Sequence, residues 1–335
     1  MERILEKSLT KNPEITIILI NYNQENFLKS SIKSVLNQTF KNFELIIIDN
    51  GSNDGSKNII KNFLNDERII FLNYNENIPV TKRLNYSVSI AKSKYINFLM
   101  ADDELIKDKL FNQIKIFNKL EDSFGVVYGP SITQNIITNN EYIANVVKIN
   151  GEALKIQLRE NLSVGHININ SALIKKECLV KYPMLEDIFI ETESIFLCFA
   201  LSYNFYFDNQ PVCFFREHKD NIGKKIFDNL DRHIKRIEVL QKMNLIKKKC
   251  DNDEINKYKG NIILNICWYS TRTNGPKKEN WRLIIYIISK HKFLFFKFKF
   301  FLILILNVMP KIILKYINKF FDNIKQSKEN NIRID

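Results

Sequence analysis

Apolar residues in the first 130 positions fall into short, almost unbroken runs, and helical patterns lie between those runs. The first run is rich in isoleucine and lacks alternation, as expected of a strand buried on both faces. Between the runs, apolar residues recur at the spacing of an amphipathic helix. The predicted strands are 15–20, 43–48, 68–72, 95–100 and 124–128, and the predicted helices are 28–36, 57–64, 81–92 and 105–120. This alternation predicts a mostly parallel sheet with right-handed crossovers.

The pattern becomes less regular after residue 130. Residues 130–165 are rich in asparagine and isoleucine, and we expect antiparallel strands and a mobile loop there. The remaining predicted elements are a strand at 167–174, a helix at 191–202, strands at 205–208 and 212–215, and helical structure from 227 to 267. The expected fold class is α/β, with a single mostly parallel sheet flanked by helices and a C-terminal helical extension.

The cysteine content and the polar start of the chain point to a reducing compartment. The five cysteines form no Cys-x-x-Cys pair and no zinc-site spacing with histidine. Residues 1–12 are largely polar and lack the apolar segment of a signal peptide. We therefore expect reduced core thiols in a cytoplasmic protein.

Positive charge is concentrated near the end of the chain. The net charge is +13, and residues 277–335 hold 13 lysines and arginines against 4 aspartates and glutamates, a net charge of +9. This distribution argues against a nucleic-acid-binding protein. The longest apolar run there, 300–306, is seven residues, whereas a membrane-spanning helix needs about 20. We predict a basic amphipathic segment lying on an anionic membrane surface; the alternative is a helical pair packed on the preceding domain.

Polar side chains stand at the carboxyl ends of three predicted strands. An Asn-Tyr-Asn sequence occupies 21–23, Asp49 follows the second strand, and Asp102 and Asp103 follow the strand at 95–100. Each group alone is a common turn or helix start. In an open α/β sheet, however, such strand ends form the ligand crevice, and carboxylate oxygens suit Mg²⁺ or Mn²⁺ shared with a phosphate. No dinucleotide fingerprint or P-loop motif is present, so we predict another kind of nucleotide site.

Six segments carry a family resemblance through their order, spacing and flanking strands. They are 15–23, 34–44, 46–54 (Ile-Ile-Ile-Asp-Asn-Gly-Ser-Asn-Asp), 79–85, 94–103 (Lys-Tyr-Ile-Asn-Phe-Leu-Met-Ala-Asp-Asp) and 215–218 (Phe-Arg-Glu-His). Together they resemble the family-2 glycosyltransferases, which have the GT-A fold. The resemblance covers roughly residues 13–220.

The resemblance implies roles for five residues in holding a nucleotide-sugar. Asp49 would accept a hydrogen bond from the nucleotide base, and Tyr22, with Asn23 beside it, would lie against that base. Asn85 would lie near the sugar or the diphosphate, and Asp102 would contact the ribose.

The resemblance also implies a divalent metal ion, Mg²⁺ or Mn²⁺, on the diphosphate. Asp103 would hold this ion, and Arg216 and His218 could meet the diphosphate or the metal. The chain departs from the family pattern at two positions. Met100 stands where the family often has a third acidic residue, and Asn50 replaces the second of two usual aspartates.

A catalytic base is expected where the helix predicted at 191–202 begins. The family's Glu-Asp pair aligns with Glu191 and Thr192 without a gap, whereas a one-residue shift aligns Glu193 with the aspartate. Threonine is not basic at neutral pH, so Glu193 is our first candidate and Glu191 the second. The alternative is that both glutamates only favour the amino terminus of the helix.

We expect four parts in the chain: a polar tail (1–12), a GT-A catalytic domain (13–220), a helical extension (221–276) and a basic membrane-associating tail (277–335). The expected activity is inverting transfer from a UDP-linked sugar to a surface glycan, such as capsule or lipopolysaccharide, on a lipid carrier at the inner face of the plasma membrane. A catalytically silent nucleotide-sugar-binding or scaffold protein is the rival. A sugar nucleotidyltransferase is disfavoured, because it would need a glycine-rich basic loop after the first strand, and the chain has Asn-Tyr-Asn there, at 21–23.

Overall fold

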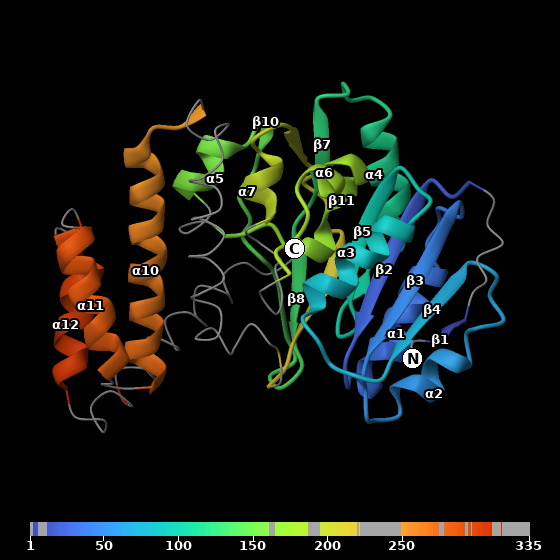
Figure 1. Ribbon diagram of the computed structural model, residues 1–335, viewed down its shortest axis with the longest axis horizontal. Helices are drawn as coiled ribbons and strands as arrows, with labels where there is room; N and C mark the ends of the chain where they lie inside the picture. The colour runs from blue at the N-terminus through green and yellow to red at the C-terminus, as the bar shows by residue number, and fades with distance from the viewer. Residues whose placement is uncertain are drawn as a thin grey trace. The chain divides into compact units, whose positions relative to one another are not determined.

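The computed structural model describes residues 3–5, 12–160, 165–186, 195–219, 221, 249–274, 278–291, 294–295, 297–309 and 316. The chain divides into two compact units, Met1–His218 and Lys219–Asp335 (Figure 1). Each unit has a hydrophobic core of its own.

A nine-stranded sheet forms the centre of the first unit, within the described residues. In spatial order its strands are β1 (Arg3–Leu5), β4 (Ile69–Tyr74), β3 (Phe43–Asn50), β2 (Ile15–Asn21), β5 (Tyr95–Met100), β11 (Leu173–Lys175), β7 (Phe124–Tyr128), β12 (Asn204–Phe207) and β10 (Asn150–Glu152). The neighbours β4, β3, β2 and β5 run parallel. Every residue of β2 and β3 is buried, which explains their continuous apolar sequence because helices cover both faces of a parallel sheet.

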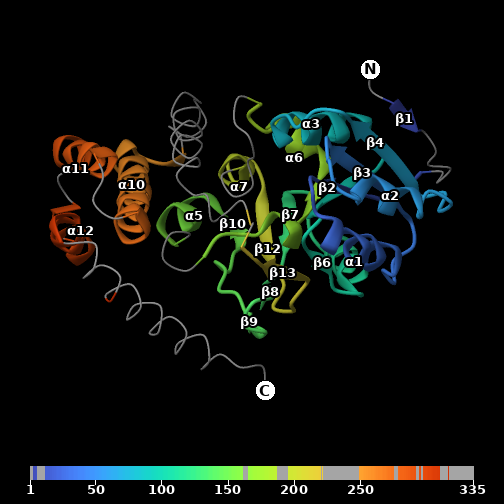
Figure 2. The same ribbon diagram turned by 90° about the horizontal axis from the view of Figure 1, so that it is seen from below.

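Helices cover both faces of this sheet. They are α1 (Glu25–Leu36), α2 (Ser56–Lys61), α3 (Val80–Ile90), α4 (Lys109–Phe117), α5 (Leu154–Glu160), α6 (Lys176–Lys181) and α7 (Ile195–Phe199), with a 3₁₀ turn, η1 (Ile169–Ser171). Figure 2 shows α3 and α6 on one face and α1 on the other. Side chains of α1, α2 and α4 share one core with β2 and β3. The predicted α/β fold, with a mostly parallel sheet and flanking helices, is confirmed.

A second, four-stranded sheet determines where the site forms. Its order is β6 (Glu104–Leu105), β13 (Cys213–Glu217), β8 (Ser131–Asn135) and β9 (Asn140–Ile143). The antiparallel pair β8 and β9 confirms the strands expected after residue 130. In β13, Phe214 pairs with Glu104. A segment more than a hundred residues away therefore lies directly beside the Asp102–Asp103 turn.

Two predicted elements differ from the structure for tertiary reasons. The helix predicted at 105–120 begins only at Lys109, because Leu105 pairs with β13 as part of β6. The strand predicted at 167–174 is a 3₁₀ turn followed by the short antiparallel strand β11, which lies between β5 and β7. Both differences come from strand pairing with distant segments, which local periodicity cannot report.

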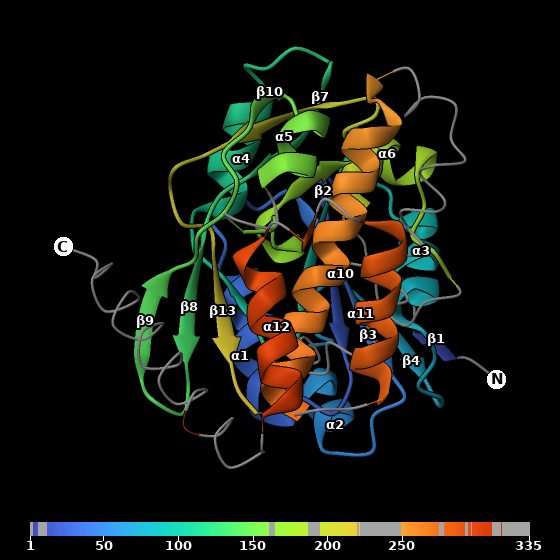
Figure 3. The same ribbon diagram turned by 90° about the vertical axis from the view of Figure 1, so that its left-hand side faces the viewer.

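The second unit contains the described helices α10 (Asn252–Asn274), α11 (Lys278–Lys290) and α12 (Phe298–Val308). Figure 3 shows α11 and α12 packed beside α10. Their core includes Ile263, Ile287 and Ile303. Most of the helical structure predicted at 227–267 lies outside the described residues. None of the described helices meets the length and apolarity required to cross a membrane.

Lys109 places an ammonium group in the core of the first unit. Its side chain is buried, and Nζ donates to Gln113 Oε1 at 2.9 Å. Gln113 in turn donates to the backbone carbonyls of Ser171 and Val127. Because burial penalises the charged form, the pKa of Lys109 falls to about 7.

This depressed pKa predicts a pH-dependent stability. Above pH 7 the folded chain releases the Lys109 proton while the unfolded chain keeps it, so the free energy of unfolding should rise with pH, by up to about 1.4 kcal/mol per unit. Urea titrations between pH 7 and 9 measure the slope, and Lys109→Met should remove it while raising stability at pH 7. An unchanged slope in Lys109→Met would show that Lys109 keeps its proton in the folded chain throughout this pH range and would contradict the prediction. Above pH 9 the buried thiols, such as Cys213 with its raised pKa, oppose the trend.

Candidate active site

The carboxyl ends of β3, β2 and β5 lie side by side at one edge of the sheet (Figure 1). The register pairs Asn21 with Asp49 and Ile20 with Met100. The polar groups that the sequence places after these strands therefore converge on one edge. This arrangement is the crevice in which open α/β sheets bind ligands.

The side chain of Asp103 points into the protein, with 1% of the residue exposed. Its Oδ1 accepts from the backbone N–H of Arg216 at 2.8 Å, and its Oδ2 accepts a short hydrogen bond from Asn170 Nδ2. Burial, followed by the neighbouring charge of Asp102, raises the pKa of Asp103 well above its usual value. Both oxygens are thus engaged in tying the turn to β13 and η1.

Asp102 makes a different set of contacts from its neighbour. Its side chain is 17% exposed, and its Oδ2 lies 3.2 Å from Nε2 of His218. The imidazole of His218 stacks on the ring of Phe27 in α1, with centroids 4.8 Å apart. A carboxylate at the end of β5 and an imidazole just after β13 therefore meet, although 116 positions separate them.

The guanidinium group of Arg216 binds the acidic turn that contains Asp102 and Asp103. Its Nε donates a short hydrogen bond to the carbonyl of Asp102, and one terminal nitrogen donates to Ser30 Oγ at 2.7 Å and to Glu104 Oε1 at 2.8 Å. The guanidinium also lies 5.0 Å from the ring centre of Phe27. These contacts direct Arg216 towards the protein, so its geometry favours positioning of the turn over contact with a diphosphate.

Asp49 lies in a buried hydrogen-bonded cluster at the ends of β2 and β3. It has no exposed surface; its Oδ2 accepts from Asn21 Nδ2 and its Oδ1 from the backbone N–H of Ser52, each at 2.9 Å. Lys57 Nζ lies 3.9 Å from the same Oδ1. The other amide atom, Asn21 Oδ1, is buried with no hydrogen-bond partner among the described residues. The cluster therefore retains one unused acceptor.

Tyr22 and Asn23 follow β2 directly and form a short loop beside this cluster, here named the rim loop. Tyr22 is 37% exposed. Asn23 adopts a left-handed backbone conformation, with φ of 52°, which asparagine tolerates better than most residues. Its Oδ1 accepts from the backbone N–H of Asn53 at 2.8 Å, and its own N–H donates to Ser52 Oγ at 3.0 Å. Asn23 thus shapes the loop, while Tyr22 offers an open aromatic surface.

Asn85, on α3, joins two parts of the chain. Its Oδ1 accepts from the backbone N–H of Met184, and its Nδ2 donates to the carbonyl of Met184 and to Glu186 Oε1. The segment that follows carries Glu191 and Glu193, which lie outside the described residues. The structure therefore leaves the predicted catalytic base untested.

Comparison with known proteins gives this site a context. A family model described as glycosyl transferase family 2 matches residues 16–179. A protein of Haemophilus influenzae named an uncharacterized glycosyltransferase is 31% identical over 185 residues, which make up 52% of this chain and 68% of that relative. The chain belongs to glycosyl transferase family 2.

Other relatives in the family match over less of their length. In three Rickettsia glycosyltransferases, the matched part spans only 32–37% of the relative's own length. WfaP of Escherichia coli, named UDP-Glc:alpha-D-GlcNAc-diphosphoundecaprenol beta-1,3-glucosyltransferase, is 38% identical over 100 residues, 30% of this chain and 39% of WfaP.

A solved structure extends the likeness of fold across both units. The mannosyltransferase PcManGT of Pyrobaculum calidifontis, in complex with GDP-Man and Mn²⁺, superposes with a TM-score of 0.55. The match covers 95% of this chain and 90% of that one, at 13% identity. At this identity the likeness shows a shared fold.

Three residues that build the site of this family-2 chain were not predicted from its sequence. Asn170 binds Asp103 and also accepts from the backbone N–H of Met100 at 3.1 Å. Phe27 supports His218, and Ser52 joins Asn21 to the rim loop. Ser52 lay within a matched segment, but Asn170 and Phe27 carried no local signal because their roles depend on distant partners.

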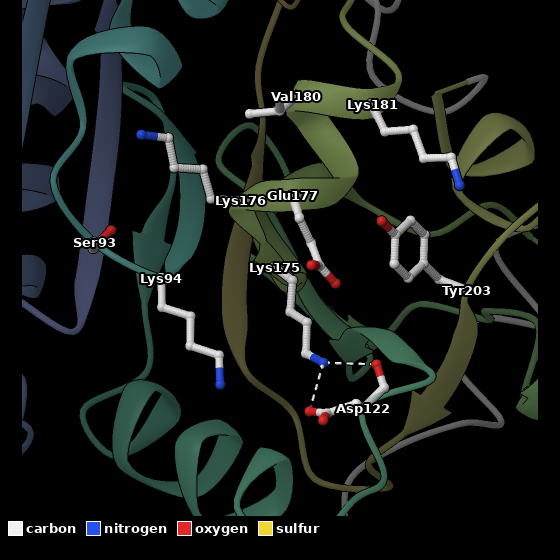
Figure 4. Close-up of a pocket in the computed structure, with 9 residues that line it drawn as sticks. All are labelled: Ser93, Lys94, Asp122, Lys175, Lys176, Glu177, Val180, Lys181 and Tyr203. Atoms are coloured by element: carbon white, nitrogen blue, oxygen red, sulfur yellow. Dashed lines mark hydrogen bonds and ion pairs between the residues drawn. The ribbon is translucent and has the colours of Figure 1, made fainter.

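A hollow of about 800 Å³ lies away from this site (Figure 4). Its lining includes Lys94, directly before β5, and Asp122, before β7. It therefore lies at the amino ends of those strands, opposite to Asp102. Lys175 Nζ is already bound there, at 2.8 Å from the carbonyl of Asp122 and 3.6 Å from its carboxylate. We assign no function to this hollow.

Proposed function

We propose that this protein is an inverting glycosyltransferase that moves a sugar from a UDP-linked donor to a hydroxyl of a glycan carried on a lipid. The observation that carries the proposal is the pairing of Asp102 with His218 at the strand-end crevice, next to the buried anchor Asp103. WfaP, whose name specifies a UDP-linked donor and a lipid diphosphate acceptor, supports this choice of substrates. We place the protein at the cytoplasmic face of the membrane, where both substrates would meet.

The donor base would bind over the cluster at the ends of β2 and β3. Tyr22 supplies an exposed ring for stacking. Asp49 is fully buried, so we propose that it orders Asn21 and Ser52. The Asn21 Oδ1 atom, which has no partner among the described residues, would accept a hydrogen bond from the imide N–H of uracil. A small shift of the rim loop would be needed for that contact.

Asp102 and His218 are the residues we propose to hold Mg²⁺ or Mn²⁺. The fit is chemical, because a carboxylate oxygen and an imidazole nitrogen, 3.2 Å apart, are both ligands for such ions. Among the described residues, no cluster of three or more acidic, histidine or cysteine side chains is suited to a metal. A site with few protein ligands is usual for Mg²⁺, which is commonly coordinated by one or two carboxylates together with the phosphates of the substrate. This proposal moves the metal from Asp103, our choice from sequence, to Asp102.

The reaction would be a single in-line displacement. The bound ion would neutralise the charge that develops on the departing diphosphate. On the opposite side of the sugar, a carboxylate would accept the proton of the attacking hydroxyl. We keep Glu193 as this base, with Glu191 second.

Glu193→Gln should retain donor binding and lose transfer by more than about 100-fold, because the amide keeps the shape but removes the basicity. The measurements are UDP binding by calorimetry and transfer to a glycan acceptor. Glu191→Gln is the matched control and should stay active. The reverse pattern would assign the base to Glu191, and activity in both variants would place it elsewhere.

A panel of nucleotide-sugars tests the proposed function as a whole. With Mn²⁺ present, we expect slow hydrolysis of one UDP-sugar and faster turnover with a lipid diphosphate glycan. The rival is a silent nucleotide-sugar-binding protein, which the apolar Met100 at a usually acidic position favours. Tight UDP binding without any turnover would support that rival.

A further inference from the structure

One face of α12 is apolar along its whole length and lies open to solvent. Phe298, Phe301, Ile305 and Val308 recur at helical spacing, and they are 76%, 54%, 46% and 70% exposed. The opposite side, including Ile303, packs into the core of the unit. Soluble proteins expose scattered apolar residues, but a continuous apolar face marks an interaction surface.

A second apolar stripe lies on α11. Trp281, Ile285 and Ile288 are 40%, 62% and 41% exposed, at i, i+4 and i+7. Figures 1 and 2 show α11 and α12 on the same side of α10. The two stripes, here named the apolar face, belong to one compact helical unit whose interior is already filled.

Positive charge predominates in the sequence that carries the apolar face, although Glu279 lies in the first turn of α11. Residues 280–321 contain eight lysines and arginines and no aspartate or glutamate. Among the described ones, Arg282, Lys290 and Lys297 are exposed. An interface between two copies of the chain would bring these like charges together, at a cost. An anionic lipid surface instead attracts them while accepting the apolar side chains.

We propose that the apolar face of α11 and α12 docks on an anionic lipid bilayer, lying in its interface. None of the described helices is long and apolar enough to cross a bilayer, which agrees with an in-plane arrangement. Phe298 and Phe301 would enter the acyl boundary, and the flanking lysines would contact lipid phosphates. The proposal deepens the proposed function, since a lipid-linked acceptor would be held at the same surface.

The test is co-sedimentation of the full chain with vesicles of phosphatidylglycerol and phosphatidylcholine, or of phosphatidylcholine alone. A Phe298→Ser, Phe301→Ser double variant should bind the anionic vesicles at least about tenfold more weakly, since two exposed aromatic anchors are lost. Phe111→Ser is the matched control, because Phe111 is 50% exposed in the first unit. It should bind like the unmodified chain. Raising NaCl from about 0.1 to 0.5 M should weaken binding several-fold and leave a salt-resistant remainder.

Several outcomes would overturn the proposal. The first is that the double variant binds anionic vesicles as tightly as the unmodified chain does. The second is that the unmodified chain binds neutral and anionic vesicles equally. The third is that the unmodified chain binds no vesicles and forms a dimer, and that the double variant is a monomer. Circular dichroism must show the same helicity in all variants, and Phe301→Leu, which retains an apolar side chain, should bind well if the double variant misfolds. Transfer to a soluble acceptor separates the two proposals. Vesicle binding without transfer contradicts only the proposed function, and transfer without vesicle binding contradicts only the docking surface.

Discussion

Asp102→Asn is expected to abolish sugar transfer while leaving the fold intact. Asp102 is partly exposed and its carboxylate lies beside His218, so the variant removes the proposed metal ligand without opening the core. Loss of several kcal/mol of transition-state stabilisation corresponds to more than about 100-fold in kcat/KM. Mn²⁺-dependent UDP binding should weaken in parallel. Calorimetric titration of UDP with and without Mn²⁺, beside a thermal unfolding curve, makes the measurement.

The adjacent residue provides the control for this prediction. Asp103→Asn should lower the free energy of unfolding by about 1–3 kcal/mol, because an amide cannot accept from both Arg216 N–H and Asn170 Nδ2. A stable Asp103→Asn protein that has lost Mn²⁺-dependent binding, next to an active Asp102→Asn protein, would return the metal to Asp103.

Arg216→Ala is expected to have the largest effect on stability. The substitution removes donors to the Asp102 carbonyl, Glu104 and Ser30 from a nearly buried position. Truncating Arg216 leaves several partly buried acceptors without their donor, and their combined loss should cost about 3–5 kcal/mol. The acidic turn would lose its support, so transfer should be lost as well.

Arg216→Lys separates positioning from charge. Lysine keeps the positive charge but lacks the planar fork, so we expect partial stability with transfer reduced mainly through kcat. Arg68→Ala is the matched control, since its ion pair with Asp66 is partly exposed and should contribute about 1 kcal/mol or less. Chemical denaturation and steady-state kinetics measure both quantities. An Arg216→Lys variant with normal stability and a raised KM for the donor would indicate direct contact with the diphosphate instead.

The strands of the central sheet could be predicted from the sequence because their signal is local. A strand buried on both faces needs an apolar run, and the run 95–100 coincides with β5 as the structure has it. The same reasoning placed Asp49 and Asp102 at strand ends, and parallel pairing then brings those ends to one edge. The resemblance to the family then predicted a nucleotide-sugar and a divalent metal ion at this edge, because the order and spacing of the motifs can be read directly from the sequence.

The tertiary structure alone decided which carboxylate faces the site. Asp102 and Asp103 are neighbours in an acidic turn, and nothing in their local sequence distinguishes a buried carboxylate from a partly exposed one. The distinction arises because β13 pairs with β6 and brings the backbone N–H of Arg216 to Asp103 and the imidazole of His218 to Asp102. Those contacts span more than a hundred residues, so only the folded chain, in which distant strands share hydrogen bonds, could separate the roles of two adjacent aspartates.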